Sequence, residues 1–141
     1  MKRLFILSLI GVFSMMGLPS GAMAGDLLED IKSECSKKWG TKYSMVKYCI
    51  DKETRAAAQV SRLLDTAPKE IVNPCMQKWG IKMSMVKYCI DKETSALNTL
   101  GNQQDNISPE IMQACLAKWG DKYSMVKYCA EREQAAKDSL K

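Results

Sequence analysis

Histidine is absent from this sequence of 141 residues, and its absence removes the side chain that most often serves as a general base. Ser–His and Cys–His nucleophile pairs are therefore excluded. The sequence also lacks the C-x-x-C pair of thiol redox enzymes and a glycine-rich phosphate loop. Together these absences predict a protein that is not an enzyme and that needs no cofactor.

Convergent acidic residues are also missing from the pattern. The repeated acids stand two residues apart, and such pairs do not face one another on a helix. They alternate with basic residues, as on a solvated helix face, and are Asp51/Glu53, Asp91/Glu93 and Glu131/Glu133. A glycosidase pair formed by distant carboxylates stays open in principle, but the spacing gives it no support. We therefore expect no catalytic residue.

Long apolar runs are limited to residues 4–16, which follow Lys2 and Arg3 and precede the small-residue motif at 22–24. This order predicts a secretory signal peptide over 1–24, cleaved after Ala24. The run is shorter than the ~20 apolar residues of a membrane span. No cysteine stands at the cleavage point to carry a lipid anchor. The segment is bacterial in style, so we expect a periplasmic or secreted protein without stable membrane insertion after cleavage.

A large excess of one sign of charge is also missing, because 21 Lys and Arg stand against 16 Asp and Glu. Loss of Lys2 and Arg3 with the signal peptide lowers the formal net charge from +5 to +3. Such a weakly basic chain does not indicate a nucleic-acid partner.

What the sequence does contain is an internal repeat with a period of 40 residues. Blocks bounded by cysteine start at residues 35, 75 and 115 and read CSKKWGTKYSMVKYC, CMQKWGIKMSMVKYC and CLAKWGDKYSMVKYC. Residues 44–54 and 84–94 are identical, whereas the segments that follow them differ almost throughout. Folding of the block is the first explanation of this contrast. The repeats are assigned to 25–66, 67–107 and 108–141.

Each repeat predicts a helix, a turn and a second helix, so we expect an all-α fold of three tandem α-hairpins. The first helix should end at the Trp-Gly pair, where glycine adopts a left-handed conformation at low cost. Apolar residues of the second helix recur at spacings of three and four. This stripe weakens in the third repeat, where Ala130 and Lys137 share a face, as suits a terminal helix with one open side. The second helices should be capped by Ser44, Ser84 and Ser124.

All six cysteines follow the predicted signal peptide, and an even number in an exported chain predicts disulfides. In each block one cysteine lies about one turn before the bend and the other about one turn after the start of the second helix. Antiparallel helices bring these two positions side by side. A unit of this size has little core, and closing such a loop contributes about 3 kcal/mol. The expected pairs are Cys35–Cys49, Cys75–Cys89 and Cys115–Cys129.

Thiol chemistry is the alternative use of these cysteines. Copper can bind Cys together with Met, and Met83 and Met85 lie inside a block. Tyr43 and Tyr123 replace Met83 in the other repeats, so the sequence predicts no repeated metal site. A metal-binding or redox-buffering protein of the envelope remains the alternative function.

Aromatic and basic residues recur around every turn. Trp39, Trp79 and Trp119 are expected to fill the small core under the disulfide, with a binding role as the alternative. The tyrosine before the second cysteine is assigned equally to core and to contact surface. Candidate binding residues are Lys42, Lys47, Tyr48, Lys82, Lys87, Tyr88, Lys122, Lys127 and Tyr128.

The pattern C-x3-W-G-x4-M-V-x2-C resembles a motif of small exported bacterial proteins of uncharacterised function. It covers the cysteine-bounded part of each repeat, which is under half of the mature chain. The resemblance implies a helical module with a disulfide and carries no activity with it. Twin-cysteine hairpins of the mitochondrial import type share the general idea only, because they use two crosslinks per hairpin.

These features predict an exported, non-enzymatic interaction protein of a binding, inhibitor or immunity-like kind. Its repeated basic and aromatic surface would face an envelope or extracellular macromolecule. Linked weak sites gain avidity without new contacts, and lysines favour an anionic partner. The expected partner is therefore a protein or an anionic envelope polymer.

Overall fold

The computed structural model describes residues 22–141, and in this range the chain forms six helices. They pair as three hairpins, α1 with α2, α3 with α4 and α5 with α6, which confirms the predicted all-α fold of tandem α-hairpins. Nearly all of the predicted signal peptide lies outside the described residues. The helices are α1 (Ala22–Trp39), α2 (Tyr43–Thr66), α3 (Lys69–Trp79), α4 (Met83–Asn102), α5 (Pro109–Trp119) and α6 (Tyr123–Ser139).

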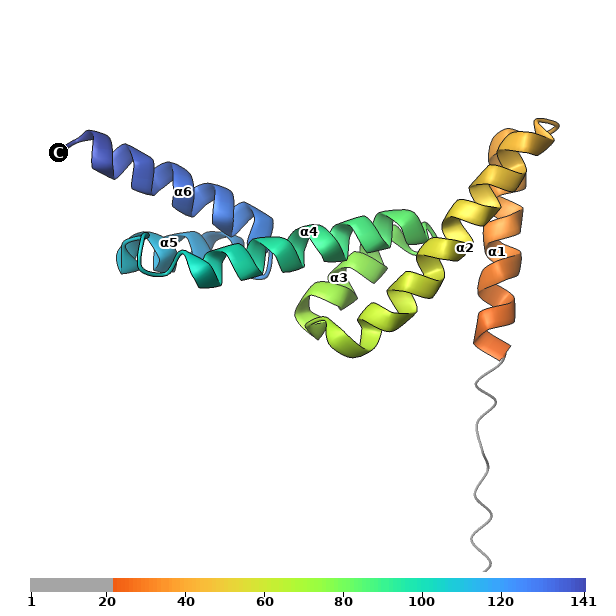
Figure 1. The fold of residues 1–141 in the computed structure, drawn as a ribbon, viewed down its shortest axis with the longest axis horizontal. Coiled ribbons are helices and arrows are strands. Elements are labelled where there is room, and N and C mark those ends of the chain that lie inside the picture. The colour runs from red at the N-terminus through yellow and green to blue at the C-terminus, as the bar shows by residue number, and fades with distance from the viewer. Residues whose placement is uncertain (1–21) are drawn as a thin grey trace, which may run out of the picture.

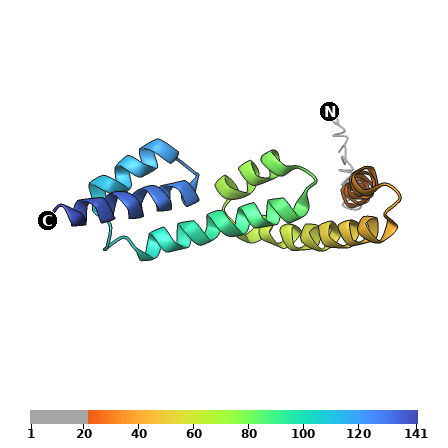
Figure 2. The same cartoon turned by 90° about the horizontal axis from the view of Figure 1, so that it is seen from above.

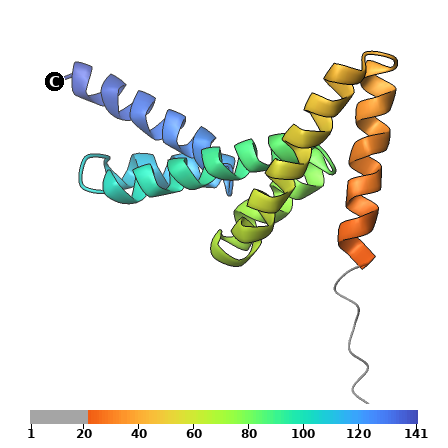
Figure 3. The ribbon, with the colours of Figure 1, turned by 45° about the vertical axis from the view of Figure 1, so that its right-hand side comes forward.

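The hairpins follow one another along an elongated molecule, with α1 and the end of α6 far apart (Figure 1). The second helices join the hairpins, because α2 packs on α4 and α4 packs on α6. Figure 2 shows α4 in the middle of this row, and Figure 3 shows α1 lying beside α2 at one end. Each hairpin therefore contacts only its neighbours, as in other repeat proteins.

Two apolar clusters form the core. The larger one joins the first two hairpins through Ile71, Val86 and Ile90, all nearly inaccessible to solvent. The smaller one lies in the third hairpin, where Val126 is buried on α6 against the end of α4. Tyr123 packs against both clusters. The apolar stripe of the second helices is thus the surface on which neighbouring hairpins meet.

The turn of each hairpin is tightly determined by backbone geometry. Gly40, Gly80 and Gly120 have φ of 54°, 53° and 54°. The ψ of Gly80 is −122°, so the backbone is that of the first central residue of a type II′ turn and not of a left-handed helix. The turn is closed by the Lys82 amide, which donates to the Trp79 carbonyl at 3.1 Å. The positive φ was predicted correctly, and it explains why glycine stands at this position in all three repeats.

The serine caps predicted for the second helices are wrong. These helices begin two residues earlier, with Lys42, Lys82 and Lys122 at the N-cap, and the lysine side chains make no capping hydrogen bond. The Lys82 carbonyl instead accepts hydrogen bonds from the amides of Met85 and Val86. Because the turn brings the chain into the helix through the lysine backbone, the serine falls inside the first helical turn.

Three disulfides crosslink the hairpins and confirm the expected pairing. Cys35–Cys49, Cys75–Cys89 and Cys115–Cys129 have Cα–Cα distances of 5.7, 5.7 and 5.8 Å. Such crosslinks are typical of proteins that fold in an oxidising compartment outside the cytoplasm. Within residues 22–141 no helix is long and apolar enough to cross a membrane.

Candidate contact surface

The tryptophan of each block lies beneath a lysine, and in the second and third blocks it also packs against the core. Trp79 and Trp119 are half-buried and pack against the two apolar clusters. In all three hairpins the preceding lysine places its ammonium over the indole ring, at 5.2, 5.0 and 5.3 Å from the ring centroid. A cation at this distance is attracted by the negative face of the ring. Trp79 and Trp119 therefore have a structural role, and in all three hairpins the preceding lysine is held beside the turn.

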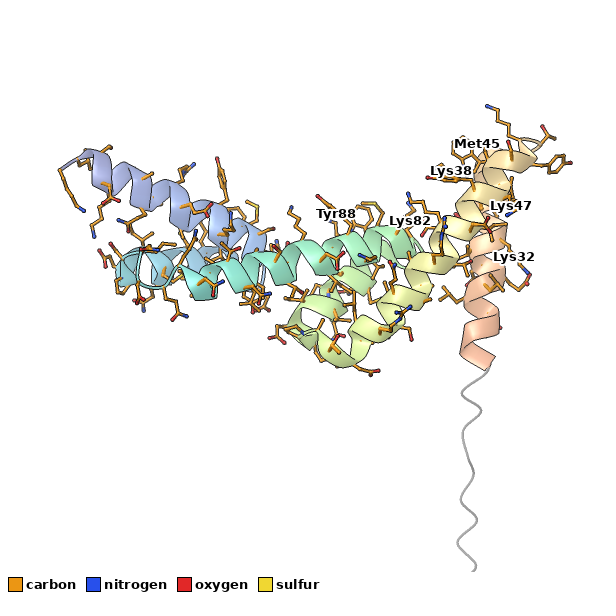
Figure 4. All side chains as sticks on the ribbon, viewed as in Figure 1. Lys32, Lys38, Met45, Lys47, Lys82 and Tyr88 are labelled. Atoms are coloured by element: carbon orange, nitrogen blue, oxygen red, sulfur yellow. A yellow bond between two sulfur atoms is a disulfide. The ribbon has the colours of Figure 1, made fainter. Side chains whose placement is uncertain are left out.

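The lysines of the predicted surface divide into two groups. Lys47, Lys87 and Lys127 form ion pairs one turn along their own helices, with Asp51, Asp91 and Glu131. Lys42, Lys82 and Lys122 lie exposed at the start of the second helices, and no ion pair within residues 22–141 includes them. Figure 4 shows Lys82 where α4 meets α2. The second group carries the charge that is available to a partner.

The tyrosine column is exposed throughout. Tyr48, Tyr88 and Tyr128 have 58%, 61% and 60% of their surface accessible, although the tyrosine precedes a cysteine that is half-buried in each hairpin. Tyr88 projects from α4 towards solvent in Figure 4. In the third hairpin the Arg132 guanidinium lies over the Tyr128 ring at 5.9 Å. The tyrosines therefore lie on the surface and not in the core.

The acidic pairs are only partly a solvated face, because Asp51 and Asp91 are exposed whereas Glu53 and Glu93 are half-buried against the next hairpin. The first acid accepts from a lysine of its own helix. The second reaches the next hairpin: the Glu53 carboxylate accepts from the Ser84 amide at 2.8 Å and from its hydroxyl at 2.6 Å. Glu93 binds Ser124 in the same way, at the same two distances. This contact was not predicted from the sequence, although the Glu and Ser columns keep a fixed spacing in every repeat.

Each glutamate thus caps a helix of the following hairpin. Its carboxylate lies at the start of a second helix, where unpaired amides and the helix dipole favour negative charge. Glu133 has the same place on α6 but binds the guanidinium of the adjacent Arg132 at 2.8 Å. That ion pair raises the pKa of Arg132 above its ordinary value.

Metal ligation and thiol chemistry find little support in the geometry. No group of three or more His, Cys, Asp or Glu side chains in the described part of the chain could hold a metal ion. The six cysteines are all in disulfides. Of the two methionines considered for copper, Met83 is buried in the larger apolar cluster and Met85 is half-buried beside the joint between hairpins.

Comparisons with protein-family models, with curated proteins and with solved structures found no match, so the contact surface is interpreted from this chain alone.

Proposed function

We propose that this is an exported, non-enzymatic binding protein that contacts an anionic protein or envelope polymer through the Tyr–Lys surface. We define this surface as the exposed tyrosines and unpaired lysines of the three turns: Tyr48, Tyr88, Tyr128, Lys42, Lys82 and Lys122. The observation that carries the proposal is the nearly equal exposure of the three tyrosines, from 58% to 61%.

Packing does not account for a tyrosine that is mostly exposed in every repeat. Tyrosine offers a large apolar ring with a polar end at small cost in side-chain entropy, and it is enriched at the centres of protein interfaces. The neighbouring lysines add positive charge, which orients and accelerates the approach of an anionic partner. Three such sites on one chain bind with higher avidity than one site.

The test is quantitative capture of envelope components by the oxidised mature protein. Two triple variants remove the surface: Tyr48, Tyr88 and Tyr128 to Ala, and Lys42, Lys82 and Lys122 to Ala. Both should lower capture by about tenfold or more, because interface tyrosines and unpaired charges at the centre of a contact contribute most of its energy. Capture by the unaltered protein should fall as salt is raised, since exposed charges are screened beyond ~8–10 Å.

A charge-matched control replaces Lys37, Lys69 and Lys92, which are exposed lysines outside the surface, with Ala. This variant loses the same charge and should capture as much as the unaltered protein. If the control and the lysine variant lost the same amount of capture, the effect would come from net charge and not from the Tyr–Lys surface. Full capture by the tyrosine variant would refute the proposal.

The metal-binding or redox-buffering alternative needs reduced cysteines. No observation in this structure favours it over the binding function, and titration of free thiols in the purified protein distinguishes the two.

A further inference from the structure

At each of the two joints between hairpins, the second helix of one hairpin supplies a covering surface. The start of the following second helix supplies the receiving surface. At each joint a glutamate from the first half of one second helix caps the following second helix. Apolar residues from the second half of that helix cover the start of the next one. At the first joint Val60 and Met83 are both buried, with 2% and 4% of their surfaces exposed. Polar capping and apolar burial therefore occur together at each joint.

The first hairpin presents an uncovered copy of the receiving surface, which we call the head: Tyr43, Ser44, Val46 and Ile50. Tyr43 is 77% exposed, whereas its counterpart Met83 is 4% exposed. Val46 and Ile50 are half-buried, although the corresponding residues of the second and third hairpins are fully buried.

The third hairpin presents an uncovered copy of the covering surface, which we call the tail: Glu133, Ala136 and Leu140. Leu140 is 87% exposed, whereas Val60 and Leu100 at the same position are 2% and 6% exposed. Ala136 is exposed, while the corresponding alanines of α2 and α4 are buried. The head and tail thus carry the two halves of a joint that is already formed twice inside the chain.

The grooves beside the disulfides show the same relation. The groove on the first hairpin is lined by Ile31, Cys35, Cys49 and Glu53, and the turn of the second hairpin closes it with Ile81, Ser84 and Met85. The groove on the third hairpin is lined by the corresponding Ile111, Cys115, Cys129 and Glu133. No turn residues from another hairpin line this second groove.

We propose that the protein associates head to tail, so that the tail of one copy covers the head of a second copy. Glu133 then leaves Arg132 and caps α2 of the neighbour at Ser44, as Glu93 caps α6 at Ser124. The contact joins two different surfaces, so it is heterologous and continues from copy to copy unless a ring closes. This assembly is independent of the Tyr–Lys surface, which stays exposed at both internal joints.

The composition of the two ends sets the strength of the contact. Tyr43 suits it, because Tyr123 occupies the same place at the second joint and packs against both core clusters. Two substitutions weaken it. Lys32 stands where Val72 is buried in the second hairpin, and Lys137 replaces the apolar Leu97 and is bound to Glu110. The association is therefore reversible and weaker than the internal joints, which are also connected through the chain.

Sedimentation equilibrium of the oxidised mature protein tests the proposal. The average mass should exceed that of the monomer and rise with protein concentration. At the internal joints the counterparts of Tyr43 lie beside the residues that correspond to Lys137, Leu140 and Lys141. A head variant, Tyr43→Lys, therefore places an ammonium against Lys137 and Lys141 of the neighbour, and a tail variant, Leu140→Lys, removes the apolar contact. Both positions are highly exposed in the monomer, so each variant should stay folded but monomeric at concentrations where the unaltered protein associates.

Mixing the two variants makes the test specific. The head variant retains an intact tail and the tail variant an intact head, so the mixture should form a one-to-one dimer and nothing larger. Tyr48→Lys is the matched head control, because position 48 and its counterparts remain exposed at the internal joints, and it should associate normally. Leu116→Lys is the matched tail control. A monomeric unaltered protein at millimolar concentration, or association that survives both end variants, would overturn the proposal.

Discussion

The same short block forms the turns that lie at the two joints and the uncovered turn of the first hairpin, with different consequences for burial. Val46 and Val86 belong to identical segments of sequence, yet Val86 is completely buried and Val46 is only half-buried. Glu93 binds the next hairpin, whereas Glu133 binds its own neighbour in the sequence. In a repeat protein the surroundings of a residue depend on which repeat packs beside it.

A second contrast separates the cysteine-bounded block from the segment that follows. The block supplies the glycine turn, the crosslink and the polar cap, and each of these requires a particular residue type. The segment that follows only has to present a small and a larger apolar residue one turn apart, such as Ala56 with Val60 or Ala96 with Leu100. Sequence divergence is therefore tolerated there. The exposed tyrosine and the N-cap lysine are repeated residues of the block whose side chains folding does not explain.

The largest expected effect comes from removing a crosslink. Cys75→Ala with Cys89→Ala should lower the free energy of unfolding by about 3 kcal/mol, because the open loop gains entropy in the unfolded chain. Cys115→Ala with Cys129→Ala removes a loop of the same sequence separation, 14 residues. Urea unfolding monitored by circular dichroism measures both. If the middle hairpin loses more free energy of unfolding, the difference measures how strongly its two joints couple it to its neighbours. Losses below about 1 kcal/mol for both variants would contradict the expectation.

Truncation of Val86 and of its counterpart Val46 measures how much stability a neighbouring hairpin adds by burying this position. Val86→Ala should cost about 2 kcal/mol, since it removes two buried methyl groups and leaves a cavity. Val46→Ala should cost less than about 1 kcal/mol at concentrations where the protein is monomeric. Equal losses would mean that burial by the neighbour contributes nothing to stability.

A smaller effect is expected at the glutamate caps. Glu93→Gln leaves one acceptor oxygen for the two donors of Ser124, so it should cost about 1 kcal/mol. Glu133→Gln at low protein concentration should leave the stability almost unchanged, because that side chain lies at an exposed end. Thermal unfolding of the two variants beside the unaltered protein gives the comparison, and a larger loss for Glu133→Gln would invert it.

The smallest expected effect is a dependence of stability on pH through Tyr123 at the second joint. Burial, followed by the charges of Asp121 and Glu70, raises the pKa of Tyr123 above its ordinary value of about 10. The stability from the neutral phenol is therefore fully present below pH ~10 and is lost as the pH rises through the higher pKa of the folded state. The difference between the phenolate absorbance of the unaltered protein and that of Tyr123→Phe should have its midpoint above pH ~10. A midpoint at or below that value would contradict burial of this ring.

Much of the fold was predictable because its signals are local. The period of 40 residues, the Trp-Gly stops and the cysteine spacing together predict hairpins with one crosslink each, and the structure has them. Of the candidate contact residues, exposure of the tyrosines needed the structure, since a tyrosine beside a cysteine can face either way. Pairing of Lys47 with Asp51 was readable from the four-residue spacing. The serine caps were wrong because the turn leads the chain into the helix two residues earlier.

The sequence by itself determined the helices, the turns and the disulfide pairs, because each depends on residues fewer than about twenty positions apart. Only the tertiary structure decided which copy of a repeated residue is buried. Ser84 and Glu53 lie 31 residues apart, and nothing in either block states that α2 packs on α4 and not on α3 alone. Because the blocks are so similar, their sequences do not specify which hairpin packs beside each one. The uncovered head and tail are therefore seen only in the arrangement of the three hairpins.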